Sequence, residues 1–333
     1  MTNRERVKAI LNGEKADRLP MVEWASWWDQ TTNRWVEQGA PHISGPDTLQ
    51  NYFGLDALRQ IWLGPKGPGC PGPSRHGGEI MIDEADYEAL KPYLYSDASL
   101  EGAYQQALAW KEGHEKGGYA TWLTLEGFFW FPRTLFGIEN HLYAFYDYPE
   151  LLHQINSDLA EYHIKCLEKI LPVLQPEFMT FAEDMSYNLG PMLSKECYDE
   201  FMLPYYKKVI PLLKKHGVKV LIDTDGNVEP LIPWFQEAGI EGVLPLERQA
   251  GVDVNRIREQ YPEWIMVGGY NKLIMHQGEE ALRAEFERLL PAMKSGRYIP
   301  SVDHQTPPAV SVEDYKLYVK LLREYAEKAC LDL

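Results

Sequence analysis

Short apolar segments followed by amphipathic helical segments recur along the whole chain, and this alternation limits the folds it can adopt. Repeated strand–helix units are typical of a parallel sheet whose right-handed crossovers place helices outside it. The pattern predicts eight strands: Leu19–Trp24, Glu79–Ile82, Tyr119–Thr124, Phe178–Ala182, Val218–Ile222, Gly242–Leu244, Trp264–Val267 and Arg297–Pro300. Eight such units favour closure into a (β/α)8 TIM barrel, an α/β fold.

Two alternatives to this assignment stay open at the level of the sequence. Arg59–Leu63 is either an extra strand or the true second strand. A doubly wound open sheet is the main alternative to a closed barrel, because it is built from the same units.

Helical patterns separate the predicted strands. The clearest are Pro149–Leu171, Ser194–His216, Val228–Ala238, Glu279–Ser295 and Ser311–Lys328. Ser194 and Ser311 are each followed by acidic residues, which is a helix-start signal. No low-complexity linker divides the chain, so residues 1–333 are predicted to form a single domain, with residues 64–78 as a Gly/Pro-rich loop.

Composition excludes several classes of partner. The formal net charge of -16 argues against binding to nucleic acid or to an anionic membrane, since both require clustered Lys and Arg. The four cysteines form no CxxC pair, which favours a reduced, cytoplasmic protein. No signal peptide and no apolar run of membrane-spanning length is recognised.

Acidic residues, one histidine and a pair of glycines follow most of the predicted strands at the end where a barrel places its active site. They are Glu23, Glu126, Glu183, Asp184, Asp223, Asp225, Glu247, Gly268, Gly269, Asp303 and His304. Two carboxylates and an imidazole can hold Zn²⁺ with an open position, or they can act as general acid and base. Each group also has a plainer interpretation as a turn or a solvated loop, because Asp and Gly are common in turns.

Aromatic residues cluster after the first and third predicted strands. Trp24, Trp27, Phe129 and Trp130 are predicted to line a pocket for a small-molecule substrate, together with Glu126 and Gly269. Tyr187 is a candidate hydrogen-bond donor into the same pocket. Walker, GxSxG and HExxH motifs are absent, so P-loop phosphoryl transfer and serine hydrolysis have no support.

Five segments of the sequence, in their order along the chain, resemble the uroporphyrinogen decarboxylase superfamily, and together they extend over nearly the whole chain. The resemblance is carried by RERVKAILNGEKADRLP, EDMSYNLGPMLSKECYDEFMLPYYKKVIPLLKKHG, DTDGNVEPLIPWFQEAGIEGVLPLE, VGGYNK and GRYIPSVDHQTPPAVSVEDYKLYVKLLREY. It implies a (β/α)8 barrel and one of two activities. One is decarboxylation of uroporphyrinogen, and the other is methyl transfer involving a corrinoid (cobalamin) on a partner protein, usually with zinc.

The sequence departs from both branches at informative positions. Where true decarboxylases carry an Arg-rich motif similar to RQAGR, this chain reads WASWWDQTTNRW, which argues against an octacarboxylate substrate. Where thiol methyltransferases place His-x-Cys and a later Cys on zinc, this chain has Asp223-Thr224-Asp225 and His304. Such a set favours oxygen and nitrogen chemistry over thiol activation.

The residues and the resemblance together predict a corrinoid-dependent methyltransferase with a corrinoid-binding protein as partner. Its donor would be a methoxylated compound, such as a methoxylated aromatic, or a methylamine-type compound. The predicted metal ligands for zinc or another divalent metal are Asp223, Asp225, His304 and Glu183; the predicted catalytic residues are His304, Asp303, Glu183 and Tyr187. The alternatives are a decarboxylase, in which Asp303 and His304 would serve protonation, and a non-catalytic binding barrel. The superfamily resemblance also implies a homodimer.

Overall fold

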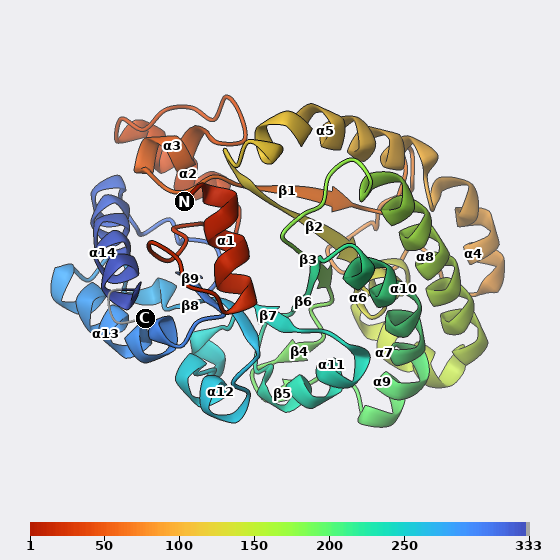
Figure 1. The fold of residues 1–333 in the computed structure, drawn as a ribbon. Coiled ribbons are helices and arrows are strands. Elements are labelled where there is room, and N and C mark those ends of the chain that lie inside the picture. The colour runs from red at the N-terminus through yellow and green to blue at the C-terminus, as the bar shows by residue number, and fades with distance from the viewer. Residues whose placement is uncertain (331–333) are drawn as a thin grey trace.

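Seven parallel strands form one sheet that curls around a central axis (Figure 1). The computed structural model describes residues 1–330. The strands, in their order in the sheet, are β1 (Leu58–Leu63), β2 (Ala120–Glu126), β3 (Phe178–Ala182), β6 (Lys219–Asp223), β7 (Gly242–Leu244), β8 (Ile265–Tyr270) and β9 (Tyr298–Val302). Sheet order follows chain order throughout, so the doubly wound alternative, which needs a reversal of strand order, is wrong.

Helices cover the outside of the sheet, with α5, α8 and α10 along one side and α13 and α14 along another (Figure 1). The α-helices are α1 (Asn3–Asn12), α2 (Asp29–Glu37), α3 (Thr48–Phe53), α4 (Glu84–Leu90), α5 (Asp97–Glu115), α6 (Trp130–Phe136), α7 (Ile138–Asp147), α8 (Pro149–Ile170), α9 (Lys195–Phe201), α10 (Leu203–Lys215), α11 (Ile232–Ala238), α12 (Val254–Gln260), α13 (Glu279–Lys294) and α14 (Val312–Cys330). Short 3-10 helices are η1 (Lys91–Tyr93), η2 (Glu229–Leu231), η3 (Arg248–Ala250) and η4 (Lys272–Ile274), and β4 (Ser186–Tyr187) and β5 (Gly190–Pro191) form a small hairpin. Across residues 1–330, no helix has the length and apolar character needed to cross a bilayer.

Six of the eight predicted strands are confirmed, and β3 and β7 have the predicted bounds. Every residue of β3, β7, β8 and β9 is buried. Strands that are covered on both faces read as continuous apolar runs, which is why the sequence located them well.

The predicted strand at Glu79–Ile82 is wrong, and β1 at Leu58–Leu63 is the true second strand. The backbone N–H groups of Ile80 and Met81 both donate to the carbonyl of Leu135 at the end of α6, so this segment packs beside a helix instead of in the sheet. Met81 is fully buried there, and the resulting apolar pattern imitates a strand. The predicted loop at residues 64–78 contains no helix or strand beyond an isolated bridge between Lys66 and Leu94.

The predicted strand at Leu19–Trp24 is extended but pairs with neither edge strand as a ladder. Pro20 has no N–H, and the N–H of Met21 donates to the Asp56 carboxylate at 3.0 Å. Neither residue can therefore donate a backbone hydrogen bond to a neighbouring strand. The segment still bonds to both edges of the sheet. The Asp56 N–H, two residues before β1, donates to the Met21 carbonyl at 2.8 Å, and the Trp24 indole donates to the Val302 carbonyl in β9 at 2.7 Å.

The predicted helix Ser194–His216 is two helices, α9 and α10, that meet at Met202. Met202 has non-helical φ and ψ of −124° and −50°, and Pro204 follows. A proline has no N–H and its ring clashes with the carbonyl four residues earlier, so it is tolerated in the first turn of a helix but not in the interior, and a new helix begins at Leu203. The first turn of predicted helix Val228–Ala238 is the 3-10 helix η2.

Helix α1 covers the amino-terminal ends of the strands. Its Asn3 side chain donates to the carbonyl of Gly118 before β2, and Arg4 pairs with Glu177 before β3 at 2.7 Å. The opposite ends of the strands are therefore the open ones. The assignment of residues 1–333 to one domain stays a prediction, and its last three residues lie outside the described part of the chain.

We expect Asp56→Ala to lower the free energy of unfolding by about 3 kcal/mol, because it leaves the Arg18 guanidinium and the Met21 N–H without their buried acceptor. Urea denaturation followed by circular dichroism measures this change. Asp97→Ala, which removes an exposed partner of Lys165, is the matched control and should leave the urea midpoint unchanged. An Asp56 variant as stable as this control would contradict the proposed role.

Candidate active site

A cavity of about 330 Å³ opens at the carboxyl ends of the strands. Four tryptophans and four carboxylic acids dominate its lining, which consists of Trp24, Ala25, Ser26, Gln60, Trp62, Trp122, Trp130, Ala182, Glu183, Asp184, Asp223, Asp225, His304 and Gln305. None of these lining residues is Lys or Arg. The predicted residues Trp24, Trp130, Glu183, Asp223, Asp225 and His304 thus come together from distant parts of the chain.

Asp223 and Asp225 form the acidic side of this cavity. Burial, and next the negative charges of Asp225 and Asp184, raise the pKa of Asp223 well above its ordinary value. Burial raises the pKa of Asp225 to about 7, with contributions from Glu247 and Asp184 that Lys272 opposes. Asp225 is therefore partly protonated near neutral pH, which suits a general acid.

His304 lies beside Asp225, with its Nε2 atom 3.6 Å from a carboxylate oxygen. Burial and the charge of Lys272 lower the pKa of His304, so its imidazole is neutral near pH 7. The ring also meets Trp24 edge-on, with 6.4 Å between centroids. A neutral imidazole beside a partly protonated carboxyl group can accept or relay a proton.

Glu183 is fully buried, and both of its carboxylate oxygens are occupied. The N–H groups of Phe128 and Phe129 each donate at 2.8 Å and that of Trp130 at 3.1 Å, while the Tyr206 hydroxyl supplies a fourth hydrogen bond. Burial raises the pKa of Glu183 to about 7 despite these donors, which favour the ionised form. Its role is to fix the turn that leads into α6, and it has no free oxygen for a metal or a substrate.

The turn around Glu183 requires glycine at position 127. A Cβ atom added to Gly127 would lie 1.9 Å from the Glu183 carboxyl carbon. Only glycine lets the backbone come close enough for three successive N–H groups to reach the carboxylate.

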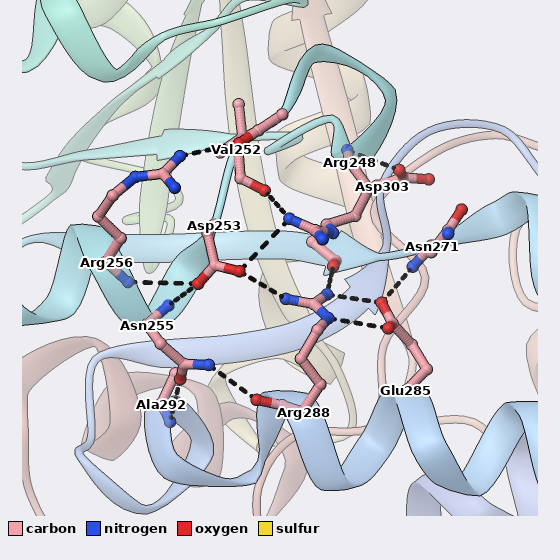
Figure 2. A network of polar contacts seen from close by, with 12 residues as sticks. Arg248, Val252, Asp253, Asn255, Arg256, Asn271, Glu285, Arg288, Ala292 and Asp303 are labelled. Carbon is pink, nitrogen blue, oxygen red and sulfur yellow. Dashed lines mark hydrogen bonds and ion pairs between the residues drawn. The ribbon is translucent and has the colours of Figure 1, made fainter.

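Asp303 is fully buried but does not line the cavity. Its carboxylate accepts from the Lys272 and Arg248 N–H groups, both at 3.0 Å, and from the Gln249 side chain at 3.1 Å. Figure 2 shows the Arg248 contact within a network that joins the loops after β7 and β8. Asp303 therefore ties these loops together, and its predicted catalytic role has no support in this geometry.

The remaining predicted site residues lie around the cavity, not in its lining. Phe129 is packed in the core against His141, and the Tyr187 side chain, on the β4–β5 hairpin, is half exposed. Glu126 lies near Lys66, and burial raises its pKa. Gly269 packs against Val254 and Tyr298, so this close approach serves backbone packing and not a ligand.

A second cavity of about 240 Å³ adjoins the first and shares Trp24, Gln60 and Trp122 with it. Trp27, predicted for the substrate pocket, lines this second cavity. The buried Glu23 also lines it, and burial raises the pKa of Glu23 to about 8 while Tyr315 and Ser301 donate to its carboxyl group.

Sequence reasoning missed Gln60, Trp62 and Trp122 as lining residues. Gln60 and Trp62 belong to β1, which was assigned only as an alternative strand, and residues two apart on a strand face the same side. Treating Arg59–Leu63 as the second strand would have placed both at the cavity. Trp122 lies inside β2, where the search for residues after strand ends could not find it.

The predicted metal ligands do not fit a metal ion in this arrangement. Glu183 has no free oxygen, as described above, and nowhere in residues 1–330 are three or more His, Cys, Asp or Glu side chains grouped as a metal site requires. We therefore derive no step through a metal.

Residues 133–325 match the family described as "Uroporphyrinogen decarboxylase (URO-D)". This chain belongs to that family. Its curated relatives include the uroporphyrinogen decarboxylase of Ruthia magnifica subsp. Calyptogena magnifica, 20% identical over 189 residues that cover 55% of this chain and 52% of the relative. That of Prochlorococcus marinus (strain NATL1A) is 26% identical over 183 residues, covering 51% and 47%. This URO-D family member thus spans about half the length of the curated relatives it matches.

A solved structure described as a methyltransferase from Methanosarcina mazei superposes with a TM-score of 0.64. The sequences are 17% identical, and the match covers 98% of this chain and 99% of that one. At this identity the likeness establishes a shared fold over the whole chain, while the activity has to be argued from the cavity.

We expect Gly127→Ala to lower the free energy of unfolding by about 3 kcal/mol, because its methyl group displaces the buried Glu183 carboxylate from its donors. Thermal or urea unfolding measures the change. Gly102→Ala on α5 is the control, because its added Cβ meets nothing within 4 Å and alanine favours a helix. Equal stability of the two variants would show that the Glu183 turn tolerates a side chain.

Proposed function

We propose that this protein is a methyltransferase that moves a methyl group from a small O-methylated or N-methylated donor to a corrinoid protein. The observation that carries the proposal is the cavity itself, which combines aromatic walls with Asp223, Asp225 and His304 at the carboxyl ends of the strands. In a barrel these ends hold the active site. The shared fold with the Methanosarcina mazei methyltransferase supports the same class. We also propose that residues 19–24 take the place of the eighth strand and close the barrel.

The cavity residues supply what methyl removal requires. When the methyl group leaves, the electron pair of the broken bond stays on the donor's oxygen or nitrogen. An ether oxygen then needs a proton, which Asp225 can give because its pKa is raised to about 7. A quaternary nitrogen leaves as a neutral amine and needs only a counter-charge during binding. The corrinoid protein serves as the acceptor of the methyl group.

Decarboxylation, the activity named for the curated relatives, fits this cavity poorly. A polycarboxylate such as uroporphyrinogen would bring negative charge to a lining with four carboxylic acids and neither Lys nor Arg. Like charges at close range in a partly buried site are unfavourable. Release of CO₂ from uroporphyrinogen by the purified protein would nevertheless decide for this second candidate.

We expect the purified protein to demethylate at least one donor from a panel of methoxylated aromatics and methylated amines when a reduced corrinoid protein is supplied. Mass spectrometry of the demethylated product measures the reaction. Asp225→Asn should lower kcat/KM about a hundredfold, because it removes either the acid or the counter-charge.

Glu313→Gln, an exposed change on α14, is the matched control for loss of one negative charge and should retain full activity. If the unaltered protein demethylates no member of the panel with a reduced corrinoid protein, the proposed function is wrong.

A further inference from the structure

Four tryptophan rings surround the larger cavity, and they come from four separate segments. Trp24 precedes α2, Trp62 lies on β1, Trp122 on β2 and Trp130 on α6. Three of these rings have fixed neighbours. The Trp24 indole donates to the Val302 carbonyl, Trp122 stacks on Phe178 with 5.3 Å between centroids, and Trp130 lies beside the Arg133 guanidinium at 5.2 Å. The faces of such rings carry negative partial charge and attract cations.

Carboxyl groups complete the lining of this cavity. Within the described chain, no side-chain or backbone donor bonds to the carboxyl group of Asp223. The nearest recorded cationic partner of Asp225 is His304, at 3.6 Å, and its imidazole is neutral near pH 7. Within residues 1–330, neither of these two acids at the end of β6 forms an ion pair with Lys or Arg, although the charge of Lys272 acts on Asp225 from its pair with Glu247.

The cations close to the cavity are already engaged. Arg133 pairs with Asp184 at 3.2 Å and donates to its carbonyl at 2.9 Å, while Lys272 lies 3.4 Å from Glu247. Neither Arg133 nor Lys272 lines the cavity. No Lys or Arg of the lining can therefore balance Asp223 and Asp225, which are left to bind protons or a cationic ligand.

A quaternary ammonium group matches this combination of walls. It carries a positive charge but no N–H, so it needs ring faces and nearby carboxylates instead of directed hydrogen-bond acceptors. A neutral methoxylated aromatic would contact the tryptophans but would leave protons alone to neutralise Asp223 and Asp225. The charge of the lining therefore discriminates between the two kinds of methyl donor.

We propose that the cavity binds a quaternary methylammonium cation, with Trp62, Trp122 and Trp130 contacting its methyl groups and Asp223 and Asp225 balancing its charge. This inference rests on the proposed function, because it names the class of donor for the same site. The second cavity, which shares Trp24, Gln60 and Trp122, then accommodates the rest of the donor molecule.

Isothermal titration calorimetry with choline and with its neutral isostere, 3,3-dimethylbutan-1-ol, tests the proposal. The two molecules have nearly the same shape, so a difference in affinity reports on charge. We expect choline to bind at least about tenfold more tightly than the alcohol. Equal affinity for the two, or no binding of choline, overturns the cation assignment.

Two variants locate the site. Trp62→Leu should weaken choline binding by about tenfold and Trp62→Phe by much less, because phenylalanine keeps a ring face. The Trp62 side chain is 49% exposed, so its replacement leaves the core intact. Trp28→Leu is the matched control, since Trp28 is 45% exposed and lies outside both cavity linings. Equal loss in the Trp28 and Trp62 variants places the cation elsewhere.

The binding assay needs no corrinoid protein, so it separates the two proposals. Selective choline binding without demethylation of any donor would leave the cation site standing and contradict the methyltransferase. Demethylation of methoxylated aromatics without selective choline binding would do the reverse.

Discussion

The buried carboxylate of Glu183 is the contact on which the geometry of the site depends. It receives three successive backbone N–H groups from the turn between β2 and α6, together with the hydroxyl of Tyr206 on α10. Four donors offset much of the cost of burying a charge. One side chain after β3 thereby fixes the start of α6, and with it the position of the Trp130 ring in the cavity.

The same loop also sets the acidic side of the cavity. The N–H groups of Glu183 and Asp184 both donate to the carbonyl of Asp223, at 2.9 and 3.3 Å, so the end of β3 holds the end of β6. Asp184 in turn binds Arg133 on α6. The backbone thus holds Asp184, Asp223 and Asp225 close together. Burial is the main cause of the raised pKa values of Asp223 and Asp225, and the negative charge of Asp184 adds to both. Carboxyl groups in such a cluster bind a proton or a cationic ligand more readily than isolated ones do. This suits them to general-acid catalysis or to cation binding.

The sequence located the strands that supply most of the site because those strands are buried on both faces. A continuous apolar run such as FMTFA at Phe178–Ala182 is typical of a strand covered on both faces, and the polar pair that follows it marks the strand end. It failed at Glu79–Ile82, where an apolar stretch packs against the end of α6 instead of pairing in the sheet. It also failed at Met202, because Pro204 has no N–H to continue the first helix and instead lies in the first turn of a second one.

The sequence by itself determined the repeating strand–helix order, the residues after β3, β6 and β9, and membership of a family whose members share this arrangement. It did not determine which of those carboxyl groups are held by backbone donors and which are left without one. Glu183 and Asp303 follow strands as Asp223 does, yet both are held by backbone N–H groups from neighbouring loops, while Asp223 is left without a donor. That distinction depends on contacts between segments more than 50 residues apart, such as Glu183 with Phe128 and Asp303 with Arg248. Only the tertiary structure places backbone donors beside the carboxylates of Glu183 and Asp303 and none beside that of Asp223.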